Sequence, residues 1–340
     1  MLVMVTGGTG FIGSHTAKAL IDANHRVKLL VRSEEKAKRV YSDLHCPLPQ
    51  LIKGDMTDPA SVSLCMEDCD AVFHSAALVT MDSTKGEKML NDNRLGTEIV
   101  LNRACEKKIR SIVYVSSIAT IFTPGQGFLE PDAPMSLSQS AYSRSKIEAE
   151  KIARSLIAKG FPIKICNPTA VIGPDDPALS EANYAIKTFM RIGIPATSSG
   201  FQFIDVRDLA QINLRLIERD AGAGVFLAGG LYRPWNELGD MLAKITGRPV
   251  RHYPVPGFML RAFGRIFDAI QKIKSINLPY SQEAMRYATQ WRPVDDSKTL
   301  QILGFSYRDQ ETTLRDTITW LYRNGRLEAK HAGIIADTRA

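Results

Sequence analysis

Cysteine is scarce in this sequence of 340 residues, and no two cysteines form a CxxC pair. A disulfide framework or a metal site built on cysteine needs closer and more regular spacing than this chain offers. We therefore expect reduced thiols, no bound metal and a cytoplasmic location. The five cysteines are Cys46, Cys65, Cys69, Cys105 and Cys166.

Long apolar runs are also missing. No stretch reaches the roughly 18 unbroken apolar residues of a membrane span. The apolar start, Met1–Val5, leads into a glycine-rich turn instead of the cleavage site of a signal peptide. Internal repeats and low-complexity linkers are absent as well, which argues against a modular array. A hydrophobic content of 44% then predicts a soluble globular protein with a sizeable core.

Short apolar runs alternate with amphipathic segments through the first half of the chain. This alternation predicts an α/β fold with a doubly wound parallel sheet of the Rossmann type. After Asn167 the pattern changes to segments punctuated by glycine and proline, with helices expected at Phe203–Ile217 and Trp235–Thr246. We expect a nucleotide-binding domain over 1–170, a smaller interleaved substrate-binding portion over 171–328 and a flexible tail over 329–340. The predicted strands are Leu2–Thr6, Val27–Val31, Gln50–Lys53, Ala71–His74, Ile112–Ser116 and Ile163–Asn167.

A glycine motif follows the first strand and opens the first helix, as a dinucleotide fingerprint requires. Gly7 permits a tight turn, Gly10 lets the backbone approach a pyrophosphate, and Gly13 packs the helix on the sheet. The helix N-terminus adds free N–H groups and a partial positive charge. The whole motif predicts a phosphate cradle made of Gly7, Thr9, Gly10, Phe11, Ile12 and Gly13.

The end of the second strand lacks the carboxylate that binds ribose hydroxyls in NAD-preferring domains. Arg32 stands there instead, with Lys38 and Arg39 close behind, within a segment that holds six Lys or Arg and two Glu. A guanidinium can pair with a 2′-phosphate and stack on adenine. This pattern favours NADP over NAD, although NAD stays open. The alternative reading of these charges is a solvated helix face.

Tyr142 and Lys146 are four residues apart in an amphipathic helical segment, so both side chains point from one face. A tyrosine hydroxyl can exchange a proton with a substrate oxygen, and an ammonium nearby lowers its pKa. The spacing alone is weak. A strand that ends in Ser116-Ser117 at the carboxyl edge of the sheet supplies a hydroxyl to hold the same oxygen.

With these motifs the sequence resembles the extended short-chain dehydrogenase/reductases over nearly its whole length. The resemblance implies that Ser117, Tyr142 and Lys146 are catalytic, with Ser116 as the fallback for the serine, and that Lys146 also holds the nicotinamide ribose. It further implies a homodimer and a set of additional cofactor contacts. The matching segments are TGGTGFIG, GDM, FHSAA, NRLGT, VYVSS, NPTAVIGP and FIDVRDLA, and the additional contacts are Asp55, Met56, Ala76, Ala77, Asn93, Asn167 and Pro168.

Three functions remain open for such a chain acting on a small-molecule substrate. The favoured one is an NADP-dependent reductase or dehydrogenase for a bulky, lipophilic substrate, similar to the dihydroflavonol reductase and 3β-hydroxysteroid dehydrogenase branch. The second is a nucleotide-sugar epimerase or dehydratase with tightly bound NAD. Against it, the segment Ala196–Gln202 has no Arg or Lys for a diphosphate, although Arg191 and Arg207 flank it. A cofactor sensor without catalysis is disfavoured because serine, tyrosine and lysine are all present.

The net charge of +7 is compatible with several anionic partners. Basic and aromatic residues do not interleave as they do in proteins that bind single-stranded nucleic acid, so no nucleic-acid partner is expected. The segment 258–273 is apolar at helical spacing and carries Arg261, Arg265 and Lys272. It is either an ordinary core-facing helix or a basic amphipathic lid that touches a membrane surface.

Overall fold

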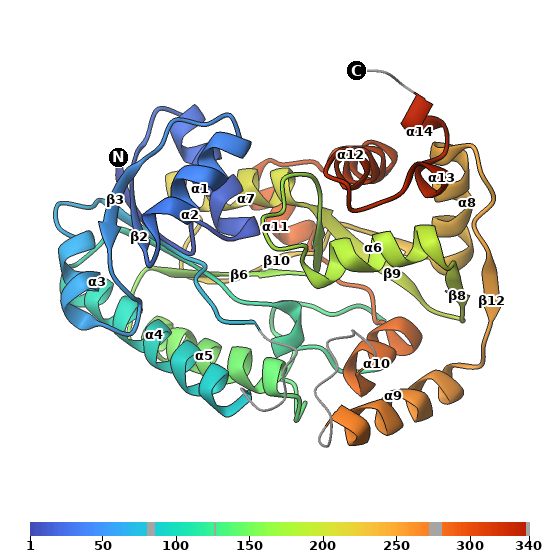
Figure 1. The fold of residues 1–340 in the computed structure, drawn as a ribbon. Coiled ribbons are helices and arrows are strands. Elements are labelled where there is room, and N and C mark those ends of the chain that lie inside the picture. Colours follow the sequence, from blue (N-terminus) through green and yellow to red (C-terminus); the bar gives the residue numbers. More distant parts are fainter. Residues whose placement is uncertain (80–85, 126, 272–280, 338–340) are drawn as a thin grey trace.

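The computed structural model describes residues 1–79, 86–125, 127–271 and 281–337, and a seven-stranded sheet forms its centre (Figure 1). The strand order is β10-β6-β5-β4-β1-β2-β3, and every neighbouring pair is parallel. The order reverses between β1 and β4, where a doubly wound sheet binds its ligand. The strands are β1 Leu2–Thr6, β2 Arg26–Val31, β3 Gln50–Lys53, β4 Ala71–His74, β5 Ser111–Val115, β6 Ile163–Pro168 and β10 Gly224–Ala228.

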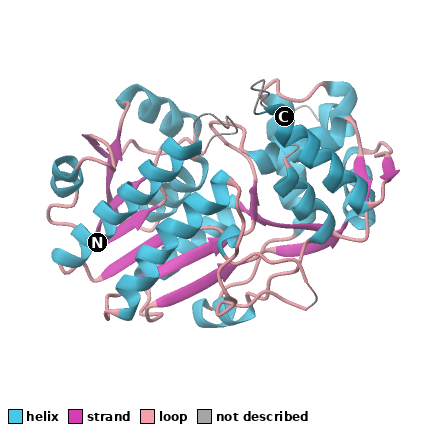
Figure 2. Cartoon of the chain, turned by 90° about the horizontal axis from the view of Figure 1, so that it is seen from below, coloured by secondary structure: helices cyan, strands magenta, loops and turns pink. Residues whose placement is uncertain are grey.

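Helices cover both faces of this sheet, because successive side chains of each buried strand point to opposite sides (Figure 2). Val3 and Val5 pack under one layer, and Leu2 and Met4 pack under the other. The expected doubly wound α/β fold is confirmed. One layer consists of α1 Phe11–Asp22, α2 Glu34–Asp43 and α7 Val206–Glu218, and the other of α3 Pro59–Cys65, α4 Gly86–Glu106 and α5 Ala141–Ala158.

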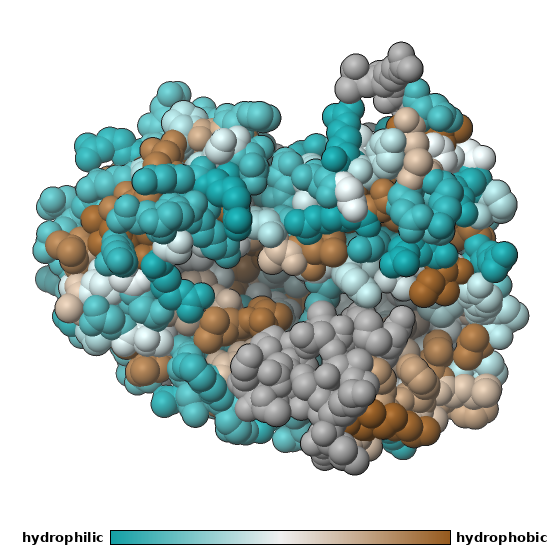
Figure 3. Space-filling view, viewed as in Figure 1, coloured by the Kyte–Doolittle hydropathy of each residue, from teal (hydrophilic) through white to brown (hydrophobic). Residues whose placement is uncertain are grey.

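The C-terminal part has its own core, which includes Trp235 and Ile318. The surface is hollowed between it and the N-terminal part (Figure 3). Two small sheets and several helices build this part: β7 Ala170–Ile172, β8 Ile194–Ala196, β9 Gly200–Asp205, β11 Leu231–Pro234, β12 His252–Pro254, α6 Glu181–Arg191, α8 Trp235–Thr246, α9 Gly257–Gln271, α10 Gln282–Gln290, α11 Ser297–Leu303 and α12 Gln310–Arg323.

Strand β10 returns from the C-terminal part to the central sheet and pairs with β6 through five residues. Beside it, Leu303 of α11 packs into the core under α1, α2 and α7. The seventh strand was not among the six that the sequence predicted.

Two further segments differ from the sequence-based expectation. Phe203–Ile217 is not one helix: Phe203 and Ile204 pair with β7, and Asp205 then caps the N-terminus of α7. Within the segment 329–340, expected to be a flexible tail, residues 329–337 form two short helices, α13 Ala329–Ala332 and α14 Ile334–Asp337. Their side chains Ala332 and Ile335 are buried in the core of the C-terminal part, which holds these two helices in place. Residues 338–340 lie outside the described residues. No helix among the described residues is long and apolar enough to cross a membrane.

Candidate active site

The glycine turn after β1 has the geometry of a phosphate cradle. Gly7 has φ +76°, and a Cβ there would lie 2.7 Å from the backbone nitrogen of Ala76. A Cβ on Gly13 would lie 2.2 Å from the carbonyl oxygen of Gly7. Around Gly10, by contrast, an added Cβ would meet only that carbonyl, at 3.3 Å, among the described residues beyond its own chain neighbours. Gly10 caps α1 without a side chain, so the first N–H groups of the helix face an open space that fits a phosphate.

A cluster of positive charge lies where β2 leads into α2. Arg32 is 69% exposed, and its Nη1 lies 3.9 Å from Oδ2 of Asp55, which follows β3. Partial burial and the charges of Arg32 and Arg39 hold the pKa of Lys36 below its usual value. Lys38, in contrast, acts on Glu35, whose pKa is lowered chiefly by hydrogen bonds. Lys36 therefore joins the predicted Arg32 and Arg39 in this cluster, and the contact predicted for Lys38 stays a prediction. Lys36 was missed because only its helical position places it there.

Asn93 on α4 supports the loop that follows β4. Its Oδ1 accepts from the backbone N–H of Leu78 at 2.7 Å, and its Nδ2 donates to the Leu78 carbonyl and to Ser145. This loop carries Ala76 and Ala77, which face the glycine turn through the contact of Ala76 with Gly7. Asn93 thus acts on the nucleotide end of the site by positioning its loop. Nearby, Met56 packs against Gly96 of α4.

Ser117, Tyr142 and Lys146 come together at the carboxyl end of β5. Ser117 follows the strand, and its hydroxyl lowers the pKa of Tyr142, so the two side chains lie near each other, with Tyr142 in the first turn of α5. One turn further, Lys146 is buried, and its Nζ donates to the carbonyl of Val115 at 3.4 Å. Burial lowers the pKa of Lys146 to about 8, although the charge of Glu150 opposes this change.

The pKa of Tyr142 is raised to about 12, chiefly by burial and to a lesser extent by the charges of Glu181 and Glu283. Ser117 acts in the opposite direction and lowers this pKa. The lowering expected from the sequence needs the ammonium of Lys146 together with an oxidised nicotinamide ring, and in the protein alone the pKa of Tyr142 is raised instead. The physical reason is that the phenol is desolvated while the ammonium of Lys146 points to Val115. Tyr142 is therefore protonated at neutral pH in the protein alone.

Glu150 occupies the next turn of α5 and was not among the site residues predicted from the sequence. Its fully buried carboxylate accepts hydrogen bonds from Ser116 at 2.6 Å, Thr120 at 2.7 Å and Asn167 at 3.1 Å, and it pairs with Arg154 at 2.7 Å. Ser116 therefore points away from Tyr142. The spacing of Tyr142, Lys146, Glu150 and Arg154, each four residues after the last, was the signal in the sequence that could have revealed this row.

Aromatic side chains lie beyond Ser117 and Tyr142. The ring of Phe122 is 4.8 Å from that of Tyr287 and 5.3 Å from that of Trp291. Tyr287 lies on α10, and its pKa is affected by Ser143 and Tyr142 of α5, so its hydroxyl lies near that helix. Glu283, one turn earlier, accepts hydrogen bonds from the hydroxyls of Ser138, Ser140 and Ser143. Helix α10 therefore borders the substrate end of the site with aromatic rings and a carboxylate.

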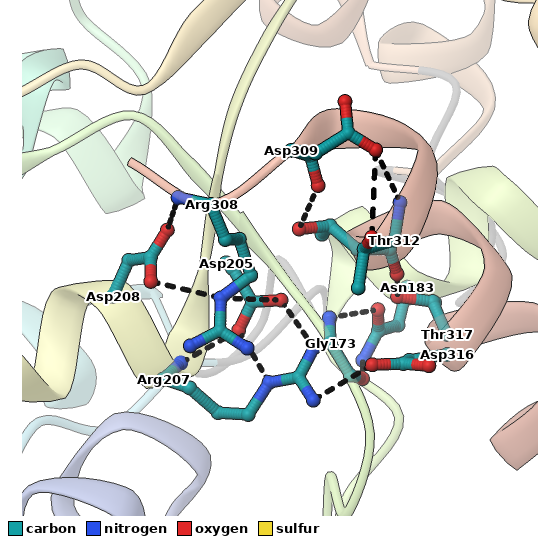
Figure 4. A network of polar contacts seen from close by, with 11 residues as sticks. Gly173, Asn183, Asp205, Arg207, Asp208, Arg308, Asp309, Thr312, Asp316 and Thr317 are labelled. Carbon is teal, nitrogen blue, oxygen red and sulfur yellow. Dashed lines mark hydrogen bonds and ion pairs between the residues drawn. The ribbon is translucent and has the colours of Figure 1, made fainter. Parts of the chain in front are cut away.

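The arginine of the FIDVRDLA segment is held by acidic side chains (Figure 4). Arg207 donates to Asp205 at 2.6 Å and pairs with Asp316 at 2.7 Å. Arg308 closes the network by pairing with Asp208 at 2.8 Å. The network joins α7 to α12 and leaves Arg207 fully engaged. Arg191, at the end of α6, acts on the pKa values of Glu328 and His331 and so lies near α13.

Comparisons with known proteins agree with this architecture. The model of the NAD dependent epimerase/dehydratase family matches residues 3–229. A putative dihydroflavonol 4-reductase of Synechocystis is 28% identical over 331 residues, which cover 94% of each chain. Cinnamoyl-CoA reductase 1 of Arabidopsis thaliana is 28% identical over 271 residues, which cover 75% of this chain and 76% of that relative.

Two solved structures of different activities share the fold. UDP-glucose 4-epimerase from Bifidobacterium longum, in complex with NAD+ and UDP, superimposes with a TM-score of 0.72 at 19% identity and covers 96% of this chain and 99% of its own. Yeast methylglyoxal/isovaleraldehyde reductase Gre2, complexed with NADPH, gives 0.70 at 20% identity and covers 96% and 100%. At these identities the likeness is one of fold.

Proposed function

Because this chain belongs to the NAD-dependent epimerase/dehydratase family and is an NAD(P)-dependent oxidoreductase or epimerase, we propose that it reduces a ketone or aldehyde on a bulky, lipophilic substrate with NADPH. The observation that carries this proposal is the meeting of Ser117, Tyr142 and Lys146 at the carboxyl end of β5. That edge of a doubly wound sheet is where ligands bind.

The residues of the chain suit a nicotinamide dinucleotide. The open side of Gly10 and the N-terminus of α1 would hold its pyrophosphate, and Arg32 with Lys36 and Arg39 would hold a 2′-phosphate. Among the further predicted contacts, Asp55 follows β3 and Ala76 and Ala77 follow β4, at the carboxyl ends of two strands of the same sheet, where they would border the nucleotide. When bound, the cofactor supplies the hydride.

Tyr142 would give the proton to the substrate oxygen, and Ser117 would hold that oxygen by a hydrogen bond. A tyrosine with a pKa of about 12 keeps its proton at neutral pH, which suits the direction of reduction. Lys146, with a pKa of about 8, is largely an ammonium at pH 7 and would bind the ribose of the nicotinamide. The proton that leaves Tyr142 must be replaced from solvent in each turnover.

The substrate end supports a reductase over a nucleotide-sugar epimerase. Glu181 and Glu283 bring negative charge near Tyr142, which would repel a diphosphate. Arg207 is engaged by Asp205 and Asp316, and Arg191 lies near α13. Neither arginine is placed to neutralise a diphosphate, so an uncharged substrate is the better fit.

The aromatic rings favour a lipophilic substrate body. Phe122, Tyr287 and Trp291 offer apolar faces next to Ser117 and Tyr142. A cleft of about 300 Å³ opens beside Trp291, between Pro124–Gly125 and Ser198–Ser199, and gives the far end of a substrate room.

Oxidation of NADPH and NADH, followed with ketosteroids, flavanonols, aldehydes and nucleotide sugars, tests the proposal. We expect turnover with one of the first three classes and NADPH. Tyr142→Phe should lower kcat at least about a hundredfold and leave the Kd of the cofactor nearly unchanged. Tyr253→Phe, on a 40% exposed tyrosine of β12, is the matched control. Normal turnover in Tyr142→Phe removes the tyrosine from the mechanism, and turnover of nucleotide sugars alone favours the epimerase. The homodimer and the cytoplasmic location stay predictions.

A further inference from the structure

Helix α9 contacts α10 through small and polar residues. A Cβ on Gly264 would lie 2.8 Å from Cα of Gln282, so the two backbones approach closely. Asp268 accepts from the backbone N–H of Gln282 at 3.1 Å, and Arg261 donates to Thr289 at 3.0 Å. Phe267 is the one large apolar side chain of α9 that is buried. The side of α9 that faces the protein is therefore mostly small or polar.

The opposite side of α9 is apolar and exposed. Phe258 is 66% exposed, Ile266 61%, Met259 53% and Ile270 45%. At 100° per residue these four side chains fall within an arc of about 120°. Figure 3 shows hydrophobic surface at the lower right, where Figure 1 places α9. A helix on the surface of a soluble protein normally has the reverse arrangement, with the apolar stripe inward.

The exposed arginine of α9 and its aspartate lie on different sides of the helix. Arg265 is exposed at the margin of the apolar arc, and no acidic residue among those described is paired with it. Asp268, the acidic residue of this helix, lies on the side that faces α10. The outward face of α9 therefore combines large apolar side chains with positive charge, which is the composition of a helix that lies in a membrane interface.

We propose that the outward face of α9, formed by Phe258, Met259, Ile266 and Ile270 with Arg265 at its margin, docks this protein on a bilayer surface containing anionic phospholipid. A second copy of the chain fits less well. A helix of 15 residues is about 22 Å long and about 10 Å wide, so its face covers about 220 Å², against about 800 Å² per partner in a stable protein interface.

This surface is one helix away from the substrate end of the active site. Helix α10 packs on α9 with one side and presents Glu283 and Tyr287 to α5 with another. Docking through α9 would bring the aromatic residues of the site close to the bilayer, where a lipophilic substrate is concentrated. The docking itself does not depend on which substrate is reduced.

Flotation of the full chain with lipid vesicles tests the docking. Vesicles of phosphatidylcholine alone are compared with vesicles that also contain phosphatidylglycerol. We expect the wild type to float with the anionic vesicles and to be released by high salt. Ile266→Glu should lower the partition coefficient at least about tenfold, since it puts a carboxylate in the centre of the apolar arc. Arg265→Gln should weaken binding to the anionic vesicles and have little effect with phosphatidylcholine.

The control is Leu64→Glu, which likewise replaces an exposed aliphatic side chain with glutamate. Leu64 is 52% exposed and belongs to α3, far from α9 in Figure 1. Melting temperatures establish that each variant is folded. The proposal is overturned if the wild type stays at the bottom of the gradient with both vesicles, or if Ile266→Glu floats as well as the wild type. It is also overturned if, without lipid, the wild type is an oligomer that Ile266→Glu converts to a monomer, because the face would then join copies of the chain. None of these outcomes requires turnover, so they are independent of the proposed reaction.

Discussion

Glu150 follows Lys146 by one turn of α5 and is the charged group that keeps the lysine protonated against its burial. Both side chains are buried, with Glu150 fully so. Burial lowers the pKa of Lys146 and the charge of Glu150 raises it, and together they place this pKa at about 8. Changing either residue should alter a different measurable property.

Replacing Lys146 with methionine should stabilise the protein at pH 7 while it abolishes activity. Because burial lowers the pKa of Lys146 from 10.5 to about 8, the unfolded chain binds more protons between these values, and stability rises with pH there. Below about pH 8 the wild type bears the full cost of the buried ammonium. The free energy of unfolding of Lys146→Met should exceed that of the wild type by up to about 3 kcal/mol at pH 7. This gain should vanish by about pH 10.5.

Urea unfolding across this pH range measures the difference. Lys151→Met, on an exposed lysine of the same helix, should leave stability within about 0.5 kcal/mol at every pH. A Lys146→Met protein that is less stable than the wild type at pH 7 would contradict the cost assigned to the ammonium.

Replacing Glu150 with glutamine should shift the pH profile of kcat/KM to lower pH. Without the carboxylate the pKa of Lys146 falls below about 8, so the ammonium is lost earlier as the pH rises. Glutamine keeps the length of the side chain and can still accept from Ser116 or Thr120, which limits the structural damage. The pH profiles of kcat/KM, measured with the same substrate on the wild type and on Glu150→Gln, test this prediction. Superimposable alkaline limbs would mean that Glu150 has no influence on the lysine.

Alanine at Ser116 and at Ser117 should have different effects. Ser117 lies near Tyr142, so Ser117→Ala should lower kcat at least about tenfold. It also removes the cap that the Ser117 hydroxyl forms with the N–H of Ala119, which should cost about 1 kcal/mol of stability. Ser116 donates to Glu150, so Ser116→Ala should cost about 1–3 kcal/mol of stability and reduce kcat less. Steady-state kinetics and thermal unfolding of both variants separate the roles. If Ser116→Ala lowered kcat more than Ser117→Ala did, and Ser117→Ala lost more stability, Ser116 would be the catalytic serine.

Cofactor preference should depend on Arg32 and its neighbours on α2. A charge-assisted pair with a phosphate is worth about 1.5–3 kcal/mol, so Arg32 should favour NADPH by about ten- to a hundredfold. Val31→Asp combined with Arg32→Ser should invert the preference, because the new carboxylate binds ribose hydroxyls and repels the phosphate. Dissociation constants for NADPH and NADH test this. Equal affinities in the wild type would rule out the phosphate contact.

Two single variants refine this test. Lys36→Gln should weaken NADPH binding selectively, because Lys36 lies in the cluster with Arg32 and Arg39. Lys38→Gln tests the other lysine of α2, which the sequence predicted as a contact and whose charge lowers the pKa of Glu35. If only Lys38→Gln weakened NADPH binding, the original assignment from the sequence would be the better one.

Features set by a few neighbouring residues were predictable from the sequence. The glycine turn, the strand before it and the four-residue spacing of Tyr142 and Lys146 are all local, and the structure has each of them. The proximity of Ser117 and Tyr142 depends on the carboxyl end of β5 and the N-terminus of α5 meeting at one edge of the sheet, which the predicted alternation of strands and helices made foreseeable.

Features that depend on distant packing were not predictable. Glu150 becomes the centre of a buried network only because β5 and β6 bring Ser116 and Asn167 to α5. Phe203 has the spacing of a helix, yet β7 provides it with a partner strand. Periodicity identified 258–273 as an amphipathic helix, but only the contacts of Gly264 with α10 show which side faces outward. Residues 272 and 273 of that segment lie outside the described residues.

Strand β10 has a consequence for how the chain is made. It closes the edge of the central sheet next to β6, and it lies more than 50 residues after that strand in the sequence. During synthesis from the N-terminus, β6 leaves the ribosome long before the strand that pairs with it, and its edge stays open meanwhile. The nucleotide-binding sheet therefore cannot complete its folding co-translationally until more than 50 residues of the substrate-binding part have also been made. Translation that stops near residue 170 would release a sheet with an exposed edge, a ready substrate for chaperones and proteases.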